Sequence, residues 1–405
     1  MKKCNNYMLI TGFLLVIFGM CLWTGKVMYL DKKTFSSFEN RNLAIDPVMT
    51  LDGLKSGKYF KDTELYFTDH IGARDLFIKT YTKLQIASRH TFINGIHVTN
   101  DKFLLYQPLQ SNHMNEVDKG IDELTHLKNS FANTEFYFAL VPSKQTALEY
   151  KFPSYVNRGY QQKHRDHFVQ KMSKTDFPII DLLPSFQQNF TKKDLERMYL
   201  TTDHHWNMEG AFYAYDYTMN YLASHSKKYK GAPVNKNDYE ITWEKPTGKF
   251  VGSWNNQLYR LIDTSSVKIP YVYFKSDESW DDYTVYLGPK KEDTPKETMK
   301  EFFGKDKNIP DPGYGSVYQG DYDEINIINP KAQNNLHVVI LKDSYADATY
   351  PLFAHNFAQT TFIDPRYPTG KSVQQQLAEQ NADIVMFLYN DTNVFGDMFK
   401  FQTIK

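Results

Sequence analysis

The hydropathy pattern of the chain begins with one long apolar run. Seventeen uncharged residues, Tyr7 to Trp23 (YMLITGFLLVIFGMCLW), follow Lys2 and Lys3. A run of this length lies at the short end of the range that crosses a bilayer as a helix. No small-residue pattern typical of a signal-peptidase site follows it. Because the basic end of such a helix tends to stay in the cytosol, we expect residues 1–28 to form a single-pass anchor in the cell membrane, with the rest of the chain extracytoplasmic.

Beyond this run the pattern becomes polar and then helical. Residues 29–50 are polar and turn-like, and we interpret them as a stalk. From 51 to 90, apolar residues recur at the spacing of an amphipathic helix; they are Leu65, Phe67, Ile71, Leu76, Phe77, Tyr81 and Leu84. We therefore expect a folded domain to begin at residue 51 and to extend to residue 405.

Short apolar runs and helical patterns alternate along the rest of the chain. Strand-like runs lie at 102–106, 135–141 (EFYFALV), 177–183 (FPIIDLL), 336–341 (LHVVIL), 361–363 and 383–388 (DIVMFL). Helical patterns lie at 155–172, from Asn207 onward, at 351–359 and at 372–380. This alternation predicts an α/β fold with a parallel sheet.

Residues 225–330 interrupt this order. They are charged and turn-rich, as in KKYK, KKEDTPKE and GKDKNIPDPGYG, and they are strand-like only at 271–274 and 283–287. We expect this segment to be a variable, partly β insertion in the domain.

Composition narrows the classes of function. Lys and Arg number 47, as do Asp and Glu, so a nucleic-acid-binding protein would lack its usual positive charge. Cys4 and Cys21 are the only cysteines, which leaves the part beyond residue 28 without a disulfide, a cysteine nucleophile or a cysteine-ligated zinc. We expect neither a cofactor nor a nucleic-acid partner.

Two polar segments directly follow strand-like runs. Asp343 and Ser344 follow LHVVIL, and Asn390 follows DIVMFL by one residue. Sheets of α/β proteins keep their sites at the carboxyl edge. A serine placed there ahead of a helix presents its hydroxyl beside free backbone N–H groups, which can stabilise an oxyanion. Such a serine still needs a base to become a nucleophile.

The run Asp203-His204-His205-Trp206 supplies a candidate base. It precedes the helix that Asn207 can cap. In an extended turn the side chains of Asp203 and His205 point the same way, so the carboxylate can fix the tautomer of the imidazole. We therefore predict a Ser-His-Asp triad of Ser344, His205 and Asp203.

Other interpretations of these residues remain open. The run could be a capped turn with Trp206 packed inward and a structural His204, and Asn390 could simply form a turn. Asp203 and the two histidines could also ligate a metal ion. However, adjacent histidines rarely converge on one ion, and neither a His-Glu-x-x-His motif nor a cysteine pair completes the set.

The run TTDHHWN resembles the DHHW family and its relatives, the alginate O-acetylation proteins, which carry an Asp-x-His-Trp signature and belong to the SGNH hydrolase group. Four further segments are similar to landmarks of the family: FENRNLAIDP (38–47), DHIGARD (69–75), VPSK (141–144) and IDPR (363–366). The resemblance extends from about residue 35 to the C-terminus. It implies an SGNH-hydrolase-like three-layer sandwich in which Asp203, His205 and Ser344 are acid, base and nucleophile.

Two departures from the wider SGNH pattern affect these expectations. The usual Gly-Asp-Ser is Lys342-Asp343-Ser344, and the Asp/His pair precedes the serine, which indicates a circular permutation of the fold. The glycine of the Gly-x-Asn-Asp element is also missing near Asn390. Arg366 and Lys144 could replace the lost oxyanion donor or could be ion-pair partners within the fold. Our candidates for substrate or oxyanion contacts are Asn390, Arg366, Lys144 and Trp206.

The resemblance implies an exported, membrane-anchored O-acetyltransferase. Ser344 would carry the acetyl group to a hydroxyl of a cell-envelope or secreted polysaccharide. Since acetyl-CoA is absent outside the cell, a membrane-bound O-acyltransferase is the expected partner that supplies the acetyl group. A polysaccharide acetylesterase with the same triad and a non-catalytic polysaccharide-binding or assembly protein are the alternatives.

Overall fold

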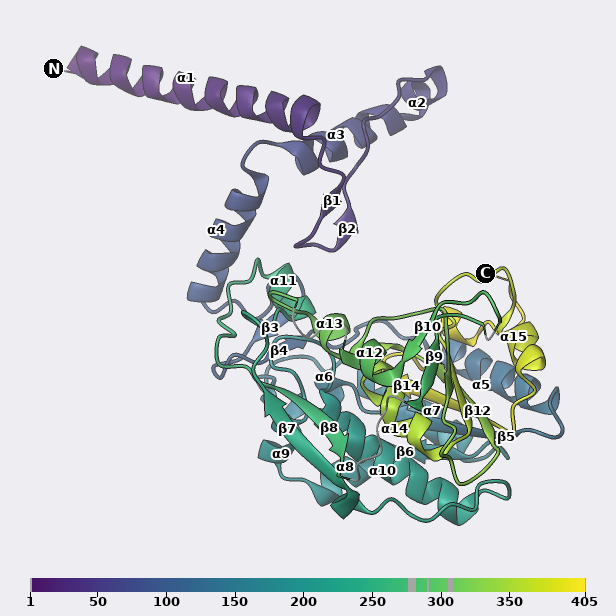
Figure 1. The fold of residues 1–405 in the computed structure, drawn as a ribbon. Helices are drawn as coiled ribbons and strands as arrows, with labels where there is room; N and C mark the ends of the chain where they lie inside the picture. Colours follow the sequence, from purple (N-terminus) through teal and green to yellow (C-terminus); the bar gives the residue numbers. More distant parts are fainter. Residues whose placement is uncertain (1, 276–281, 290, 305–308, 405) are drawn as a thin grey trace. The chain divides into compact units, whose positions relative to one another are not determined.

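The computed structural model describes residues 2–275, 282–289, 291–304 and 309–404 (Figure 1). The chain forms two compact units. The smaller unit is Met1–Asn94 with Trp254–Ile262, and the larger unit is Gly95–Ser253 with Asp263–Lys405. The start of the main domain at residue 51 stays a prediction, and the larger unit begins at Gly95. Residues 51–94 instead group with the N-terminal segment, because their close contacts are made there.

The smaller unit consists mainly of helices. Its first helix, α1 (Lys2–Lys26), continues into a π-helical turn (Val27–Asp31). A short antiparallel hairpin follows, of β1 (Phe35–Ser36) and β2 (Arg41–Asn42), and then α2 (Leu51–Ser56), α3 (Lys58–His70) and α4 (Arg74–Ala87). Among the described residues, the segment Tyr7–Asp31 is the one helical segment long and apolar enough to cross a bilayer. Such a helix fits either a membrane anchor or a signal sequence.

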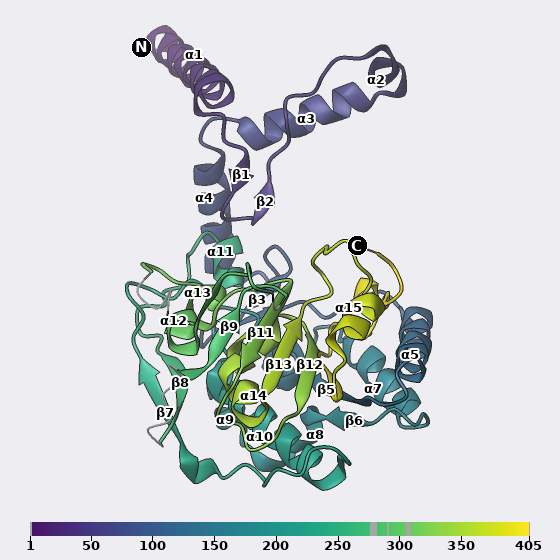
Figure 2. The ribbon, with the colours of Figure 1, turned by 45° about the vertical axis from the view of Figure 1, so that its right-hand side comes forward.

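The larger unit is built on an eight-stranded sheet, in the order β10-β9-β11-β13-β12-β14-β5-β6 (Figure 2). The strands are β5 (Glu135–Val141), β6 (Ile179–Asp181), β9 (Thr284–Tyr286), β10 (Lys296–Thr298), β11 (Glu324–Ile328), β12 (His337–Lys342), β13 (Gln359–Ile363) and β14 (Ile384–Asn390). The five strands from β13 to β6 are parallel, as predicted. The strands β10, β9 and β11 are antiparallel, so the sheet is mixed and not wholly parallel as expected.

These three antiparallel strands come from the segment that the sequence analysis set apart as an insertion, 225–330. Antiparallel strands can be joined by short turns, whereas parallel strands need long crossovers. The turn-rich segment 225–330 therefore adds its strands to the sheet in antiparallel orientation. The same segment also forms a separate pair, β7 (Tyr239–Glu244) with β8 (Ile269–Phe274). Residues 276–281, 290 and 305–308 of the segment lie outside the described residues.

Helices cover both faces of the sheet and produce three layers. Residues of α5 (Met114–Asn129), α7 (Gln161–Met172) and α15 (Val373–Gln380) share one core with Phe138 and Phe387. On the opposite face, Tyr137 of β5 contacts Tyr221 of α10 (Met208–His225). The ring of Tyr215 in α10 also packs against α14 (Tyr350–Asn356). Because both faces are covered, the central strands β5 and β14 are buried along nearly their whole length, and their sequences read as continuous apolar runs.

The remaining elements are short. They are the hairpin β3 (Ile96–Val98) with β4 (Leu104–Tyr106) and the helices α6 (Lys144–Ala147), α8 (Leu182–Asn189), α9 (Lys192–Arg197), α11 (Ser253–Gln257), α12 (Met299–Gly304) and α13 (Tyr314–Tyr318). The strand predicted at 102–106 exists as β4, but it pairs with β3 and not with the main sheet.

Candidate active site

Ser344 lies at the carboxyl end of β12, at the start of a 3-10 helix (Ser344–Thr349). The carboxylate of Asp343 caps this helix by accepting the N–H of Tyr345 at 2.9 Å. Its second oxygen accepts the backbone and side-chain N–H groups of Asn390, each at 2.7 Å. Asp343 thus fixes the turn on both sides of the serine. Because the first N–H groups of a helix have no acceptor within it, the N–H of Ser344 is a candidate oxyanion donor.

The turn that carries His205 is closed by a β-bridge between Tyr199 and Trp206, and α10 begins two residues after the bridge. Asn207 caps α10 as predicted, because its Oδ1 accepts the N–H groups of Glu209 and Gly210. Trp206 is fully buried, and its indole N–H donates to the carbonyl of Tyr345 at 2.7 Å. Trp206 therefore joins this turn to the residue after Ser344 and makes no contact suited to substrate binding.

The structure brings Asp203, His205 and Ser344 into one hydrogen-bonded line. Nε2 of His205 lies 2.7 Å from Oγ of Ser344, and Nδ1 of His205 lies 2.7 Å from Oδ1 of Asp203. Ser344 is half-buried, whereas the other two side chains are buried. The ring of Tyr314 stacks on the imidazole of His205 at 3.7 Å between centroids and 9° between planes. The imidazole is thus held at both nitrogens and on one face.

Asp203 is held in its ionised form. Burial opposes ionisation, but the neighbouring imidazoles of His204 and His205 and the N–H of Ser253 lower the pKa of Asp203 below its ordinary value. The N–H of Ser253 donates to Oδ2 at 2.7 Å, and the N–H of His205 donates to Oδ1 at 3.1 Å. An ionised carboxylate at Nδ1 leaves Nε2 of a neutral imidazole free to accept the serine proton.

The segment that supports Asp203, at the start of α11, was not predicted from the sequence. A Cβ atom on Gly252 would lie 2.2 Å from the carbonyl of Thr202, so only glycine lets this segment approach. The contribution of Ser253 to Asp203 is a backbone N–H, which any residue other than proline possesses. No side-chain pattern could therefore have indicated it. Tyr314 was missed as well, since nothing in the GYGS run marks a ring that covers His205.

Lys144 does not point at the reacting atoms as an oxyanion donor would. Its side chain is fully buried, and Nζ donates to three backbone carbonyls: Leu200 at 2.7 Å, Thr201 at 2.8 Å and Asp203 at 2.9 Å. All three ammonium hydrogens are thereby used. The expectation of an oxyanion role for Lys144 is therefore wrong, and the side chain instead fastens the turn that carries Asp203.

Asn390 and Arg366 are also engaged elsewhere. The side-chain N–H₂ of Asn390 donates one hydrogen bond to Asp343. Arg366 pairs through Nε and one terminal nitrogen with Asp364, and with Asp321 at 2.9 Å. Burial lowers the pKa of Arg366, but the two carboxylates raise it, and the net pKa lies above the ordinary value. Both side chains thus hold carboxylates of the fold, and their role as oxyanion donors stays a prediction.

Lys342, which replaces the glycine of the SGNH pattern, lies at the centre of this carboxylate cluster. Its buried Nζ contacts Asp347 at 2.7 Å, Asp321 at 2.9 Å and Asp364 at 3.4 Å. Burial alone would lower the pKa of Lys342, but the surrounding carboxylates raise it. The substitution of lysine for glycine therefore supplies the charge that three buried or partly buried carboxylates require.

Asp203, His204 and His205 form a group whose potential ligand atoms lie within 4.8 Å of one another. In the described part of the chain, Nδ1 of His205 is bonded to Asp203, and Nδ1 of His204 contacts Oγ of Ser253 at 2.8 Å. These hydrogen bonds occupy Nδ1 of both imidazoles, one of the two nitrogens through which each could bind a metal ion. The geometry suits an acid-base pair better than a metal site.

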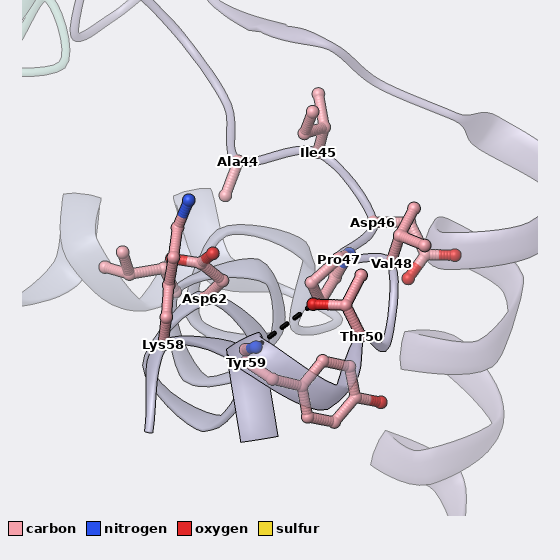
Figure 3. A pocket seen from close by; sticks show the side chains of 11 residues that line it. Ala44, Ile45, Asp46, Pro47, Val48, Thr50, Lys58, Tyr59 and Asp62 are labelled. Carbon is pink, nitrogen blue, oxygen red and sulfur yellow. Dashed lines mark hydrogen bonds between the residues drawn. The ribbon is translucent and has the colours of Figure 1, made fainter. Parts of the chain in front are cut away.

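The smaller unit contains a separate cavity of about 550 Å³ (Figure 3). It lies between the loop 44–50 and α3, and its lining includes Ile45, Val48, Lys58, Tyr59 and Asp62. None of the predicted site residues lines it, so it has no part in the chemistry of the triad.

Comparisons with known proteins show the family to which the chain belongs. The model for the "SGNH hydrolase-like domain, acetyltransferase AlgX" matches residues 101–279, which include Asp203, His205 and Trp206 but not Ser344. No curated protein sequence matches the chain with significance.

Two solved structures of PatB1 from Bacillus cereus are similar over most of the chain. One is 36% identical, with a TM-score of 0.67, and covers 76% of this chain and 99% of that protein. The other, which carries a sulfonyl adduct, is 34% identical, with a TM-score of 0.66, and covers 77% and 100%. A DHHW family protein from Eubacterium siraeum shares the fold at 17% identity, with a TM-score of 0.57 over 78% and 97%. The chain therefore belongs to the family of Bacillus cereus PatB1, with an SGNH hydrolase-like domain of the acetyltransferase AlgX type.

Proposed function

We propose that this protein is a serine-dependent O-acetyltransferase that modifies hydroxyl groups of a cell-envelope or secreted polysaccharide. The observation that carries the proposal is the line of hydrogen bonds from Ser344 Oγ through His205 to Asp203, with both distances at 2.7 Å. The acetyltransferase described by the matching family model and the sulfonyl adduct solved on the relative PatB1 support it, since a sulfonyl adduct requires a nucleophilic side chain.

The proposed first half-reaction acetylates Ser344. Ser344 Oγ attacks the carbonyl carbon of the acetyl donor while His205 Nε2 takes the hydroxyl proton. The ionised Asp203 stabilises the resulting imidazolium. When the tetrahedral intermediate collapses, the bond to the donor oxygen breaks, and His205 returns the proton to that oxygen. The product is an acetyl ester on Ser344.

The second half-reaction transfers the acetyl group from Ser344 to the acceptor. A hydroxyl of the acceptor gives its proton to His205 and attacks the acetyl carbonyl. Collapse of this intermediate breaks the bond to Ser344, which regains its proton from His205. The acceptor leaves with the new ester, and the enzyme returns to its starting state.

The donor must reach the site from across the membrane, because acetyl-CoA is a cytosolic compound. We propose that a membrane-bound O-acyltransferase hands over the acetyl group and that α1 anchors the protein beside it. The uncharged run Tyr7–Trp23 in α1 supports the anchoring.

Ester-linked acetate on the envelope polysaccharide tests the proposal. Cells that carry Ser344→Ala should lose this acetate, whereas Ser173→Ala, an exposed serine at the end of α7, should retain the wild-type amount. Unchanged acetate in Ser344→Ala would indicate a non-catalytic polysaccharide-binding protein. More acetate than in the wild type would indicate an acetylesterase.

A further inference from the structure

A stripe of large apolar side chains on α4 faces solvent. Phe77, Tyr81 and Leu84 are spaced by four and three residues, which places them on one face of the helix. Their exposed fractions are 52%, 62% and 63%. Soluble surfaces rarely leave several large apolar residues side by side without a partner. This face of α4 is therefore a candidate docking surface.

The rest of α4 shows that the stripe is not the inward face of the helix. Thr82 is buried and Ile78 and Ile86 are half-buried, so the inward face is already covered. Lys79 and Lys83 are exposed on a further face. A helix with apolar residues on two opposite faces needs a second apolar environment.

The neighbouring helix α3 is less suited to this role. Its exposed residues Phe60 and Phe67 share a face with Glu64, which is also exposed. A carboxylate in the middle of the stripe would have to leave water if the face were covered. The uninterrupted stripe of α4 is the stronger candidate.

The start of α4 is fastened to the last turn of the apolar helix α1 (Figure 1). The N–H of Gly72 donates to Oγ1 of Thr24 at 2.9 Å. A Cβ on Gly72 would lie 2.8 Å from the ring of Trp23, so the two segments touch at this point. Lys33, just beyond α1, pairs with Asp75 in the first turn of α4 at 2.9 Å.

Ion pairs between the DHIGARD segment (69–75) and the hairpin β1–β2 hold the start of α4 in place. Asp69 accepts two hydrogen bonds from Arg41, at 2.8 and 2.6 Å. Arg74 donates to both oxygens of Glu39, at 3.1 and 2.9 Å. The segment that resembled a family landmark thus joins α3, α4 and the hairpin β1–β2 to the end of α1.

These contacts place the first turn of α4 at a membrane boundary if α1 spans the bilayer. The 25 residues of α1 would extend about 37 Å, against a hydrocarbon core of about 30 Å. The last turn, with Trp23, would then lie at the outer interface, where tryptophan and tyrosine are favoured. The apolar stripe of α4 starts only a few residues away.

We propose that α4 lies on the outer surface of the bilayer, with Phe77, Tyr81 and Leu84 inserted at the boundary between lipid headgroups and acyl chains. This inference rests on the proposed anchoring by α1. An amphipathic helix of this kind binds by burying its apolar face, and basic residues such as Lys79 and Lys83 favour anionic lipids. The lipid surface would hold the protein at two points, α1 and α4.

Spin labels in the full-length protein test this proposal. In a background of Cys4→Ala and Cys21→Ala, a nitroxide is attached at Leu84→Cys, at the matched control Lys83→Cys and at Leu14→Cys in α1. The protein is reconstituted in nanodiscs of phosphatidylcholine and phosphatidylglycerol. Collisions with oxygen, which partitions into lipid, and with a water-soluble nickel chelate are then measured by electron paramagnetic resonance.

The label at position 84 should be about threefold less accessible to nickel than the label at 83, with a higher oxygen accessibility and a mobile spectrum. Equal nickel accessibility at 83 and 84 overturns the proposed docking of α4. If the label at 14 is exposed to lipid in the same experiment, anchoring by α1 still holds. An immobilised label at 84 without oxygen accessibility also overturns it, since protein would then cover the stripe. A nickel-accessible label at 14 refutes the anchor and the lipid docking together.

Discussion

Nζ of Lys144 lies 2.9 Å from the backbone carbonyl of Asp203, and the residue that carries the carboxylate of the triad is thereby tied to the end of the central strand β5. The ammonium group is fully buried, and burial lowers the pKa of Lys144 well below its ordinary value. The same residue donates its backbone N–H to the hydroxyl of Tyr345 at 3.2 Å. Lys144 thus contacts both segments that supply the triad and touches none of its reacting atoms.

We predict that Lys144→Met lowers kcat by about 10- to 100-fold and changes KM much less. The substitution removes the ammonium donor from three carbonyls, of which that of Thr201 keeps the N–H of Leu104. A buried carbonyl left unsatisfied costs about 1–3 kcal/mol, and the turn at Asp203 loosens. Steady-state kinetics on an acetyl ester, with thermal unfolding to confirm the fold, measures this. The control is Lys151→Met, because Lys151 pairs with Asp101 and Glu196 away from the triad. Equal losses in the two variants would contradict a positioning role for Lys144.

Gly252→Ala should lower activity because it displaces the backbone that supports Asp203. The new Cβ would meet the carbonyl of Thr202 at 2.2 Å and would push Ser253 away from Asp203, which it supports at 2.7 Å. We expect kcat to fall at least about tenfold and the free energy of unfolding to fall by about 1–3 kcal/mol, the usual cost of overpacking. The matched control is Gly320→Ala, whose Cβ would meet nothing within 4 Å. Wild-type kinetics for Gly252→Ala would show that the segment does not support the triad.

Trp206→Phe should loosen the contact between the turn that carries His205 and the turn that carries Ser344. It removes the 2.7 Å hydrogen bond to the carbonyl of Tyr345 and leaves a gap in the core. We expect the free energy of unfolding to fall by about 2–3 kcal/mol and kcat to fall with it. Urea denaturation and kinetics at a temperature where both proteins are folded would test this. Trp243→Phe, in the half-buried strand β7, should leave kcat unchanged. If Trp206→Phe retained full activity, the indole bond would have no part in aligning Ser344 with His205.

The strands that form the middle of the sheet could be predicted from the sequence because both of their faces are buried. The apolar runs at 135–141 and 383–388 correspond to β5 (Glu135–Val141) and β14 (Ile384–Asn390), and Asn207 caps α10 as its side chain indicates. The partners of the polar residues could not be predicted in this way. Lys144, Asn390 and Arg366 were candidates for an oxyanion site because of their positions in the sequence. Each instead meets a carbonyl or carboxylate from a distant segment, which for Arg366 is Asp321, and only the folded chain reveals these partners.

Local patterns also explain which parts of the triad could be found. Asp203 and His205 are two residues apart, so their contact depends on one turn. Ser344 was predicted as a strand-end serine, and the 2.7 Å contact with His205 joins segments 139 residues apart. The backbone donor Ser253 and the covering ring of Tyr314 carry no such pattern and were missed. The circular permutation inferred from the order of these residues stays a prediction.

The buried carboxyl of Asp391 should make stability depend on pH. Burial raises its pKa in the folded protein to about 6, compared with about 3.9 for an unfolded chain. Because the unfolded state ionises first, the contribution of Asp391 is complete below pH of about 4 and is lost as pH rises through about 6. Wild type should therefore lose up to about 3 kcal/mol over this interval relative to Asp391→Asn. Urea denaturation of both proteins at a series of pH values measures the difference. A difference that does not vary with pH would mean that Asp391 is ionised throughout.

The central claim is that Ser344, activated by His205, carries the acetyl group. The most direct measurement is to mix the full-length protein with an activated acetyl ester, stop the reaction in acid and locate the acetyl group by mass spectrometry of the peptides. We predict one acetyl group on the peptide that contains Ser344 in the wild type, and none there in His205→Ala. An unmodified Ser344 peptide in an active enzyme, or an acetyl group that accumulates on another residue, would contradict it.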